Sequence, residues 1–148
     1  MRPNVEAVCR KMAEDLLVRV LPAISPTYHQ GTVGMVASVF SIIGEEWDRA
    51  ASRRIEENDR IREIFRDAAP CLNDVALKRR LIALADTKDR DFHISALEKN
   101  NCDLRATLIE LHAYVETQPG ADARRIEETI WKELLASTER RRLSTAQF

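Results

Sequence analysis

The stretch from Pro26 to about Ala69 constrains the fold of this chain more than any other part. It contains no proline after Pro26, and its apolar residues recur at steps of three and four, the spacing of one face of an α-helix. These residues are Val33, Val36, Phe40, Ile43, Trp47, Ile61, Ile64, Phe65 and Ala68. The pattern predicts one helix, which at about 1.5 Å per residue would be roughly 65 Å long, about twice the width of a small domain.

The rest of the chain is expected to pack around this long helix. The same periodicity predicts four further helices, at about 3–21, 72–85, 94–117 and 121–142. Short turns between them predict an all-α fold, an antiparallel four-helix bundle with one unusually long helix (about 26–69) and an additional short helix. We expect residues 1–148 to form a single helical bundle domain, because this length supplies enough interior to fold without staples.

The two halves of the long helix differ in character. The first half carries a stripe of small residues, which predicts close approach of another helix: Gly34, Ala37, Ser38, Ser41 and Gly44. In the second half, the segment from Ser52 to Arg60 interrupts the apolar seam, with Arg54 at a core position in one register and Asn58 in another. Either this segment leaves the bundle and is solvated, or it forms a polar layer inside the bundle. The excess length of the helix favours solvation.

Composition and charge exclude several classes of protein. The net charge of −1 argues against a nucleic-acid-binding protein, which would more often carry a basic surplus. The three cysteines form no CxxC pair, so a reducing compartment fits better than a disulfide framework. Charges at Arg2, Glu6 and Arg10 argue against a signal peptide. The longest apolar run, Val33 to Gly44, is too short for a bilayer, which needs about 20 residues. We therefore expect a cytoplasmic protein without a membrane partner.

Known catalytic and metal motifs are absent from the sequence. Helical bundles that hold two iron ions carry Glu-x-x-His on two helices, and none of His29, His93 and His112 has glutamate three residues before it. Motifs of the type GxSxG, HExxH, GxxxxGK[ST] and GxGxxG are also missing. We expect no metal and no cofactor, and a non-enzymatic protein rather than an enzyme.

The polar residues at or near core-facing positions are the best candidates for a binding site. They are Arg54, Asn58, Asn101, Arg105 and His112. Asn101 is the single polar member of an otherwise unbroken heptad seam in the fourth helix, and such a residue often sets register or oligomeric state. A second candidate is an anion site at the start of the long helix, where His29, Gln30 and Gly31 lie beside helical amide groups.

Two functions follow as hypotheses. The first is a helical protein that acts through protein–protein contacts, as a homodimer or with another protein partner, as suggested by the excess length of its long helix. The alternative is a small-molecule-binding bundle, or an enzyme, with a polar site between the long helix and the fourth helix. The sequence identifies neither the partner nor the ligand.

Overall fold

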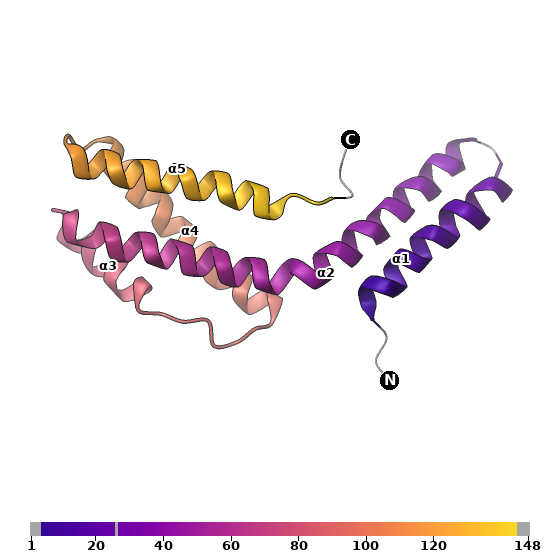
Figure 1. Ribbon diagram of the computed structural model, residues 1–148, viewed down its shortest axis with the longest axis horizontal. Coiled ribbons are helices and arrows are strands. Elements are labelled where there is room, and N and C mark those ends of the chain that lie inside the picture. The colour runs from indigo at the N-terminus through magenta and orange to yellow at the C-terminus, as the bar shows by residue number, and fades with distance from the viewer. Residues whose placement is uncertain (1–3, 26, 145–148) are drawn as a thin grey trace. The chain divides into compact units, whose positions relative to one another are not determined.

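The computed structural model of the chain describes residues 4–25 and 27–144, and every regular element in these ranges is helical (Figure 1). The α-helices are α1 (Val5–Asp15), α2 (Thr27–Ala68), α3 (Val75–Ala85), α4 (Ile94–Glu116) and α5 (Ala121–Arg141). A π-helical turn, Leu16–Val20, and a 3₁₀ turn, Leu21–Ala23, continue α1, and a second 3₁₀ turn, Ala69–Cys71, follows α2. The predicted all-α fold with one unusually long helix is confirmed.

The helix ends follow from residues that stop or cap a helix. Asn4 caps α1 by accepting a hydrogen bond from the backbone N–H of Ala7 at 3.1 Å, and Asp74 caps α3 in the same way. Pro70 lies in the turn that ends α2. Gly120 has a φ of 117°, a conformation that favours glycine, and it allows the turn between α4 and α5.

The chain forms two compact units that divide α2 between them. The first, here called the hairpin unit, consists of residues 1–50 and 142–148, of which 4–25, 27–50 and 142–144 are described. The second, here called the core unit, is Ala51–Arg141. The expectation that residues 1–148 form one domain stays a prediction.

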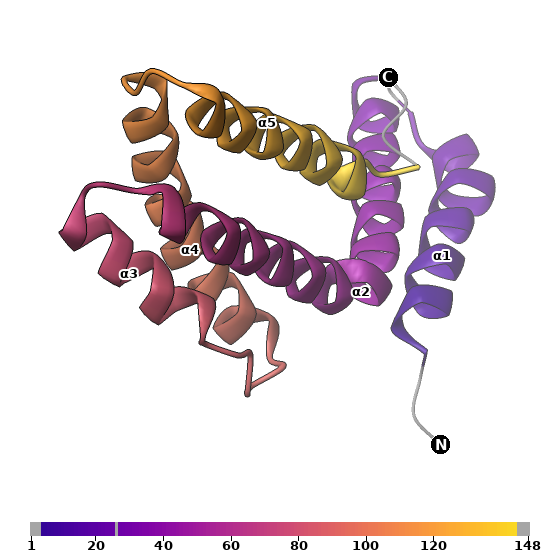
Figure 2. The ribbon, with the colours of Figure 1, turned by 60° about the vertical axis from the view of Figure 1, so that its left-hand side comes forward.

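The core unit has an apolar interior built from four helical segments. Phe65 on α2, Leu81 on α3, Leu111 on α4 and Ile130 on α5 are at most 1% exposed. Figure 2 shows α5 antiparallel to the second half of α2. All members of the main apolar cluster belong to this unit, so it buries the side chains that stabilise a small domain.

The hairpin unit pairs α1 with the first half of α2, and these two helices lie side by side in Figures 1 and 2. Its buried apolar side chains, among the residues described, are all small: Cys9, Ala13, Ala37 and Ala50. A Cβ atom on Gly44 would lie 3.2 Å from Cys9 Cβ and 3.4 Å from the carbonyl oxygen of Glu6. Close helix approach, predicted from the small-residue stripe, therefore occurs at Gly44, whereas a Cβ on Gly34 would meet nothing within 4 Å.

These two glycines make a matched pair for a stability test. We expect Gly34→Ala to stabilise α2 by up to about 1 kcal/mol, because alanine is the better helix former and space is open. Gly44→Ala should not give this stabilisation, because the added Cβ would push α1 away. Gly44→Val should destabilise the hairpin unit by about 1–3 kcal/mol. Hydrogen exchange of the α1 amides measures both effects. Equal gains from alanine at the two positions would contradict the close contact.

Candidate functional site

A layer of polar side chains crosses the inside of the core unit. On α2, Glu57, Asn58 and Arg62 are 1%, 0% and 2% exposed. The interrupted segment Ser52–Arg60 is therefore not solvated throughout, and the expectation of solvation is wrong at Glu57 and Asn58. The physical reason is helical periodicity: positions 57, 58, 61, 62 and 65 share one face, and Ile61 and Phe65 carry that face into the core.

Glu57 forms the first half of this polar layer and joins three helices. One carboxylate oxygen accepts hydrogen bonds from Arg105 on α4, at 2.9 Å, and from the hydroxyl of Ser137 on α5. The other accepts hydrogen bonds from Arg141 at 2.7 Å and from Asn101 at 3.2 Å. Burial acts to raise the pKa of Glu57, but the hydrogen bonds from Arg141 and Ser137 and the two guanidinium charges outweigh it and lower the pKa.

Asp89 forms the second half of the layer and anchors the connector between α3 and α4. Two nitrogens of the Arg62 guanidinium each lie 3.0 Å from an oxygen of Asp89, and the two side chains are 2% and 4% exposed. Asn58 and Asn100 also donate hydrogen bonds to this carboxylate. Burial acts to raise the pKa of Asp89, but hydrogen bonds from Arg62, Asn100 and Asn58 and the Arg62 charge lower it below its usual value.

The amides of Asn58 and Asn101 join the two halves. Asn101 Nδ2 donates to Asn58 Oδ1 at 2.9 Å, and Asn101 Oδ1 accepts from Arg141 at 3.4 Å. Asn58 Nδ2 donates to Asp89 and, at 3.4 Å, to the carbonyl oxygen of Leu97. The chain itself thus supplies partners for both the donor and the acceptor of each amide, which suits a role in fixing the register of α2 against α4.

The structure brings together three of the five residues proposed for a polar site. Asn58, Asn101 and Arg105 meet in the polar layer. Arg54 forms an ion pair with Glu98 on α4. His112 lies further along α4, where its ring packs edge-on against the ring of Trp131, with the two ring centroids 5.2 Å apart. Whether these residues bind a ligand stays a prediction.

Sequence reasoning missed Glu57, Arg62 and Asp89 as members of the layer. The sequence did hold a signal for Glu57, because this residue ends one of the rows of core-facing positions in the predicted long helix. Arg62 follows the core residue Ile61 and carries no pattern of its own. Asp89 lies in the charged run 86–93, where no periodicity indicates which side chain turns inward.

The residues proposed for an anion site lie in the first turns of α2. The side chain of Gln30 donates to the carbonyl oxygen of Ile24 at 2.9 Å, so its amide N–H closes the turn that precedes the helix. His29 and Gly31 are exposed, and the His29 ring contacts that of Tyr28. Anion binding at these residues stays a prediction.

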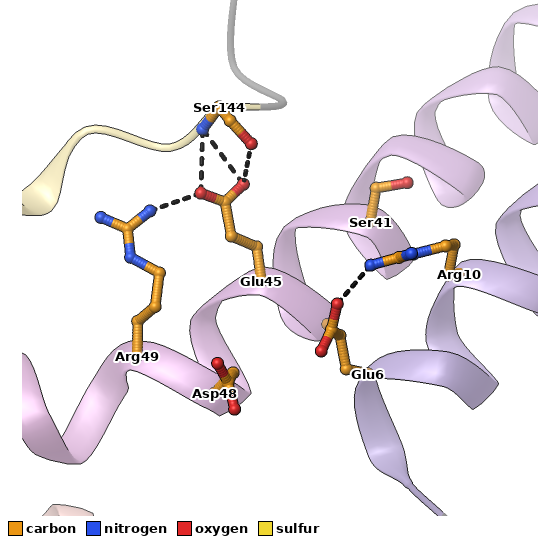
Figure 3. Close-up of a pocket in the computed structure, with 8 residues that line it drawn as sticks. Glu6, Arg10, Ser41, Glu45, Asp48, Arg49 and Ser144 are labelled. Carbon is orange, nitrogen blue, oxygen red and sulfur yellow. Dashed lines mark hydrogen bonds and ion pairs between the residues drawn. The ribbon is translucent and has the colours of Figure 1, made fainter.

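A pocket of about 340 Å³ in the hairpin unit is lined by charged side chains that pair with one another (Figure 3). Arg10 binds Glu6 on α1, and Arg49 binds Glu45 on α2. The backbone N–H of Ser144 donates to both oxygens of Glu45, at 2.9 and 3.1 Å, and its hydroxyl donates to one of them. Asp48 adds a third carboxylate, so the lining holds three acidic and two basic side chains.

One group of side chains could hold a metal ion. The ligand atoms of His112, Glu116 and Glu127 all lie within 4.8 Å of one another, and they come from α4 and α5. The spacing of His112 and Glu116, four residues apart on one helix face, was visible in the sequence but was overlooked. The third member was not predictable, because it depends on how α5 packs against α4.

The buried pair in the polar layer leads to a stability prediction. Asp89→Asn removes the buried charge that compensates Arg62 and leaves its pair with the exposed Asp59, so we expect the core unit to lose about 3 kcal/mol of its free energy of unfolding at neutral pH. Asp86→Asn, at an exposed position of the same connector, should change it by less than about 0.5 kcal/mol. Urea unfolding followed by circular dichroism measures both. Equal stabilities of the two variants would contradict the importance of the buried pair.

The lowered pKa values predict the sign of the pH dependence. Glu57 and Asp89 stabilise the core unit above their unfolded pKa values, and this contribution is lost as pH falls through the lower folded values. Glu133 acts in the opposite sense, because burial raises its pKa against the influence of Arg140. Urea unfolding between pH 7 and pH 3 should show a loss of stability in acid that is smaller in Asp89→Asn. An unchanged pH dependence in that variant would refute the assignment.

Comparisons with known proteins indicate no family for this chain. No protein-family model matches it, and neither the curated proteins nor the solved structures contain a match. The function is therefore argued from its own residues.

Proposed function

We propose that this chain acts through protein–protein association, and that the hairpin unit is its association surface, with a second copy of the chain as partner. The observation that carries the proposal is a stripe of exposed apolar side chains along the first half of α2. This stripe, here called the hairpin face, consists of Tyr28, Met35, Val36, Val39, Ile43 and Trp47.

The hairpin face has the spacing and exposure of an unpaired helix seam. Met35, Val39, Ile43 and Trp47 follow one another at steps of four, which places them along one side of the helix. Met35 is 67% exposed and Trp47 is 59% exposed. Single exposed apolar residues are ordinary, but a continuous stripe of them is typical of an interaction surface.

The energetics of the hairpin unit also favour a partner. An isolated helix of 11 residues such as α1 is marginal in water, and helices in proteins gain most of their stability from packing of an apolar face. Here the packing between α1 and α2 buries only small apolar side chains among the described residues. A partner that covers the hairpin face would bury its apolar side chains, and each Å² of apolar surface removed from water would stabilise the complex by roughly 25 cal/mol.

The charge pattern favours a second copy as the partner. From Val20 to Gly44 the sequence contains no Asp, Glu, Lys or Arg, so two copies of this part of the hairpin face can meet without like-charge repulsion. The Trp47 end of the face lies between Glu46 and Asp48. A two-fold interface places the same patch on both subunits, which suits an apolar, uncharged face. Two hairpins packed in this way would form a four-helix bundle.

The size of the surface is adequate for a dimer. The helix from Thr27 to Trp47 is about 30 Å long, and two adjacent helices are about 20 Å wide, which gives a face on the order of 600 Å². Specific interfaces bury about 600–1,000 Å² per partner, so this face lies at the lower end of that range. Because Val8 and Met12 on α1 are also exposed, both helices of the unit can contribute apolar surface.

A membrane surface is a weaker candidate for covering this face. No helix among the described residues is long and apolar enough to cross a bilayer. Helices that lie on a membrane usually carry Lys or Arg along their polar side, and α2 has neither between Thr27 and Gly44.

The alternative function, a small-molecule site or an enzyme between α2 and α4, has less support. The hydrogen-bonding groups of Asn58 and Asn101 are used by neighbouring side chains and by Leu97. Glu57 likewise accepts four hydrogen bonds from the chain itself. A ligand there would have to displace these internal partners.

Size-exclusion chromatography with light scattering tests the proposal. The full chain should elute as a dimer of twice its 16.9 kDa mass at high micromolar concentration. Val39→Glu places a charge in the middle of the hairpin face and should shift the protein to monomer. Ile109→Glu, at a 69% exposed position of α4 in the core unit, is the matched control and should stay dimeric.

Two results would overturn the proposal. The first is a monomer at all concentrations, which would leave the hairpin face to a different protein. The second is a dimer that survives Val39→Glu and dissociates in Ile109→Glu, which would place the interface on the core unit. Circular dichroism of both variants checks that they remain helical.

A further inference from the structure

The geometry points to a site for a divalent transition-metal ion, zinc by its ligand set, held by His112 and Glu116 of α4 and Glu127 of α5. The three ligand atoms lie within 4.8 Å of one another. This site lies in the core unit and is independent of the association proposed for the hairpin unit.

The first argument is an imidazole nitrogen that lacks a hydrogen-bond partner. His112 Nε2 is buried from solvent and accepts or donates no hydrogen bond in the described part of the chain. Its nearest charged neighbour is a carboxylate oxygen of Glu116, at 3.5 Å. A buried polar atom without a partner costs free energy, and a metal ion bound at this nitrogen would remove that cost.

The second argument is an uncompensated pair of carboxylates. Glu127 is half-buried, and its side chain forms no hydrogen bond or ion pair with any residue that the structure describes. The side chain of Glu116 forms an ion pair with His112. With a neutral imidazole, the cluster carries two negative charges, which a divalent cation would neutralise. In this respect it differs from the polar layer, where each buried carboxylate faces a guanidinium.

The ligand types select the metal. Carboxylate oxygens alone would suit Mg²⁺ or Ca²⁺, whereas an imidazole nitrogen in the set favours zinc and its neighbours in the first transition series. Ligand atoms on one tetrahedral zinc ion are about 3.3 Å apart, given bonds of about 2.0 Å. The Glu116 side chain is 53% exposed, and its carboxylate oxygen lies 3.5 Å from His112 Nε2, close to that separation.

The three residues would leave one tetrahedral position open. A zinc ion with three protein ligands and a water molecule is the arrangement of catalytic zinc sites, whereas structural sites use four protein ligands. The ion would also link α4 to α5, so its binding should stabilise the core unit by mass action.

Calorimetric titration of the full chain with zinc chloride tests the site directly. We expect one Zn²⁺ bound per chain near pH 7.5 and no binding of Mg²⁺. Glu116→Gln and Glu127→Gln keep the size of the side chain and should each weaken zinc binding at least about 10-fold, since each removes a charged ligand. Glu128→Gln, at the exposed neighbouring position on α5, is the matched control and should bind zinc as the unmodified chain does.

A spectroscopic readout locates the ion. Trp131 packs against His112, and the chain has one other tryptophan, Trp47. In a Trp47→Phe background, Co²⁺ should quench the fluorescence of Trp131, and the additional change His112→Gln should abolish the quenching. Zinc should compete with Co²⁺ and restore the signal.

Three results would overturn the assignment. One is the absence of zinc binding at 100-fold excess over about 10 µM protein, where micromolar affinity would give saturation. Another is binding that persists unchanged in both glutamine variants. The third is binding that is lost when the exposed Cys71 and Cys102 are changed to serine, which would assign the ion to thiols.

Discussion

The fold of the core unit depends on the compensation of a buried carboxylate, Glu57, by cations from two other helices. A buried charge is tolerated only when it is paired and hydrogen-bonded, and here Arg105 on α4 and Arg141 on α5 provide the charges. Further along α2, Arg62 compensates a second buried carboxylate, Asp89 of the connector between α3 and α4. Apolar contacts tolerate sliding of one helix past another, whereas these pairs match at one register alone. The polar layer therefore specifies how α2, α4 and α5 align, while the apolar cluster supplies most of the stability.

The first half of α2 has no comparable interior. Its contact with α1 is made close by Gly44; Val33, Phe40 and Ile42 are only partly buried, and Met35 and Trp47 are mostly exposed. In the second half of α2, most of the apolar side chains are buried and the buried polar side chains are hydrogen-bonded. In the first half, no other segment of the described chain covers the exposed apolar side chains. This contrast is the physical basis for assigning association to the hairpin unit. The cluster of His112, Glu116 and Glu127 is a separate feature of the core unit.

Much of the fold was predictable from local signals, because helix periodicity and helix-stopping residues act over a few positions. The long helix predicted from 26 to 69 is observed as Thr27–Ala68. Burial of Asn101 followed from its place in a heptad seam, but the side-chain partners of the polar layer did not follow from sequence. Glu57 and Asn58 lie where two registers compete, and Asp89 lies in a connector without periodicity. The approach of Glu127 to His112 depends on the packing of two helices, which no local pattern encodes.

The central claim is that the hairpin face is covered by a second copy of the chain. Hydrogen exchange at low and high protein concentration tests it most directly, because the same sample reports on both units. The account predicts that amides of Thr27–Ala50 become slower to exchange as concentration rises, while those of α4 do not change. Slow exchange of Thr27–Ala50 in a sample that light scattering shows to be monomeric would mean that the hairpin unit is stable alone, and it would contradict the account.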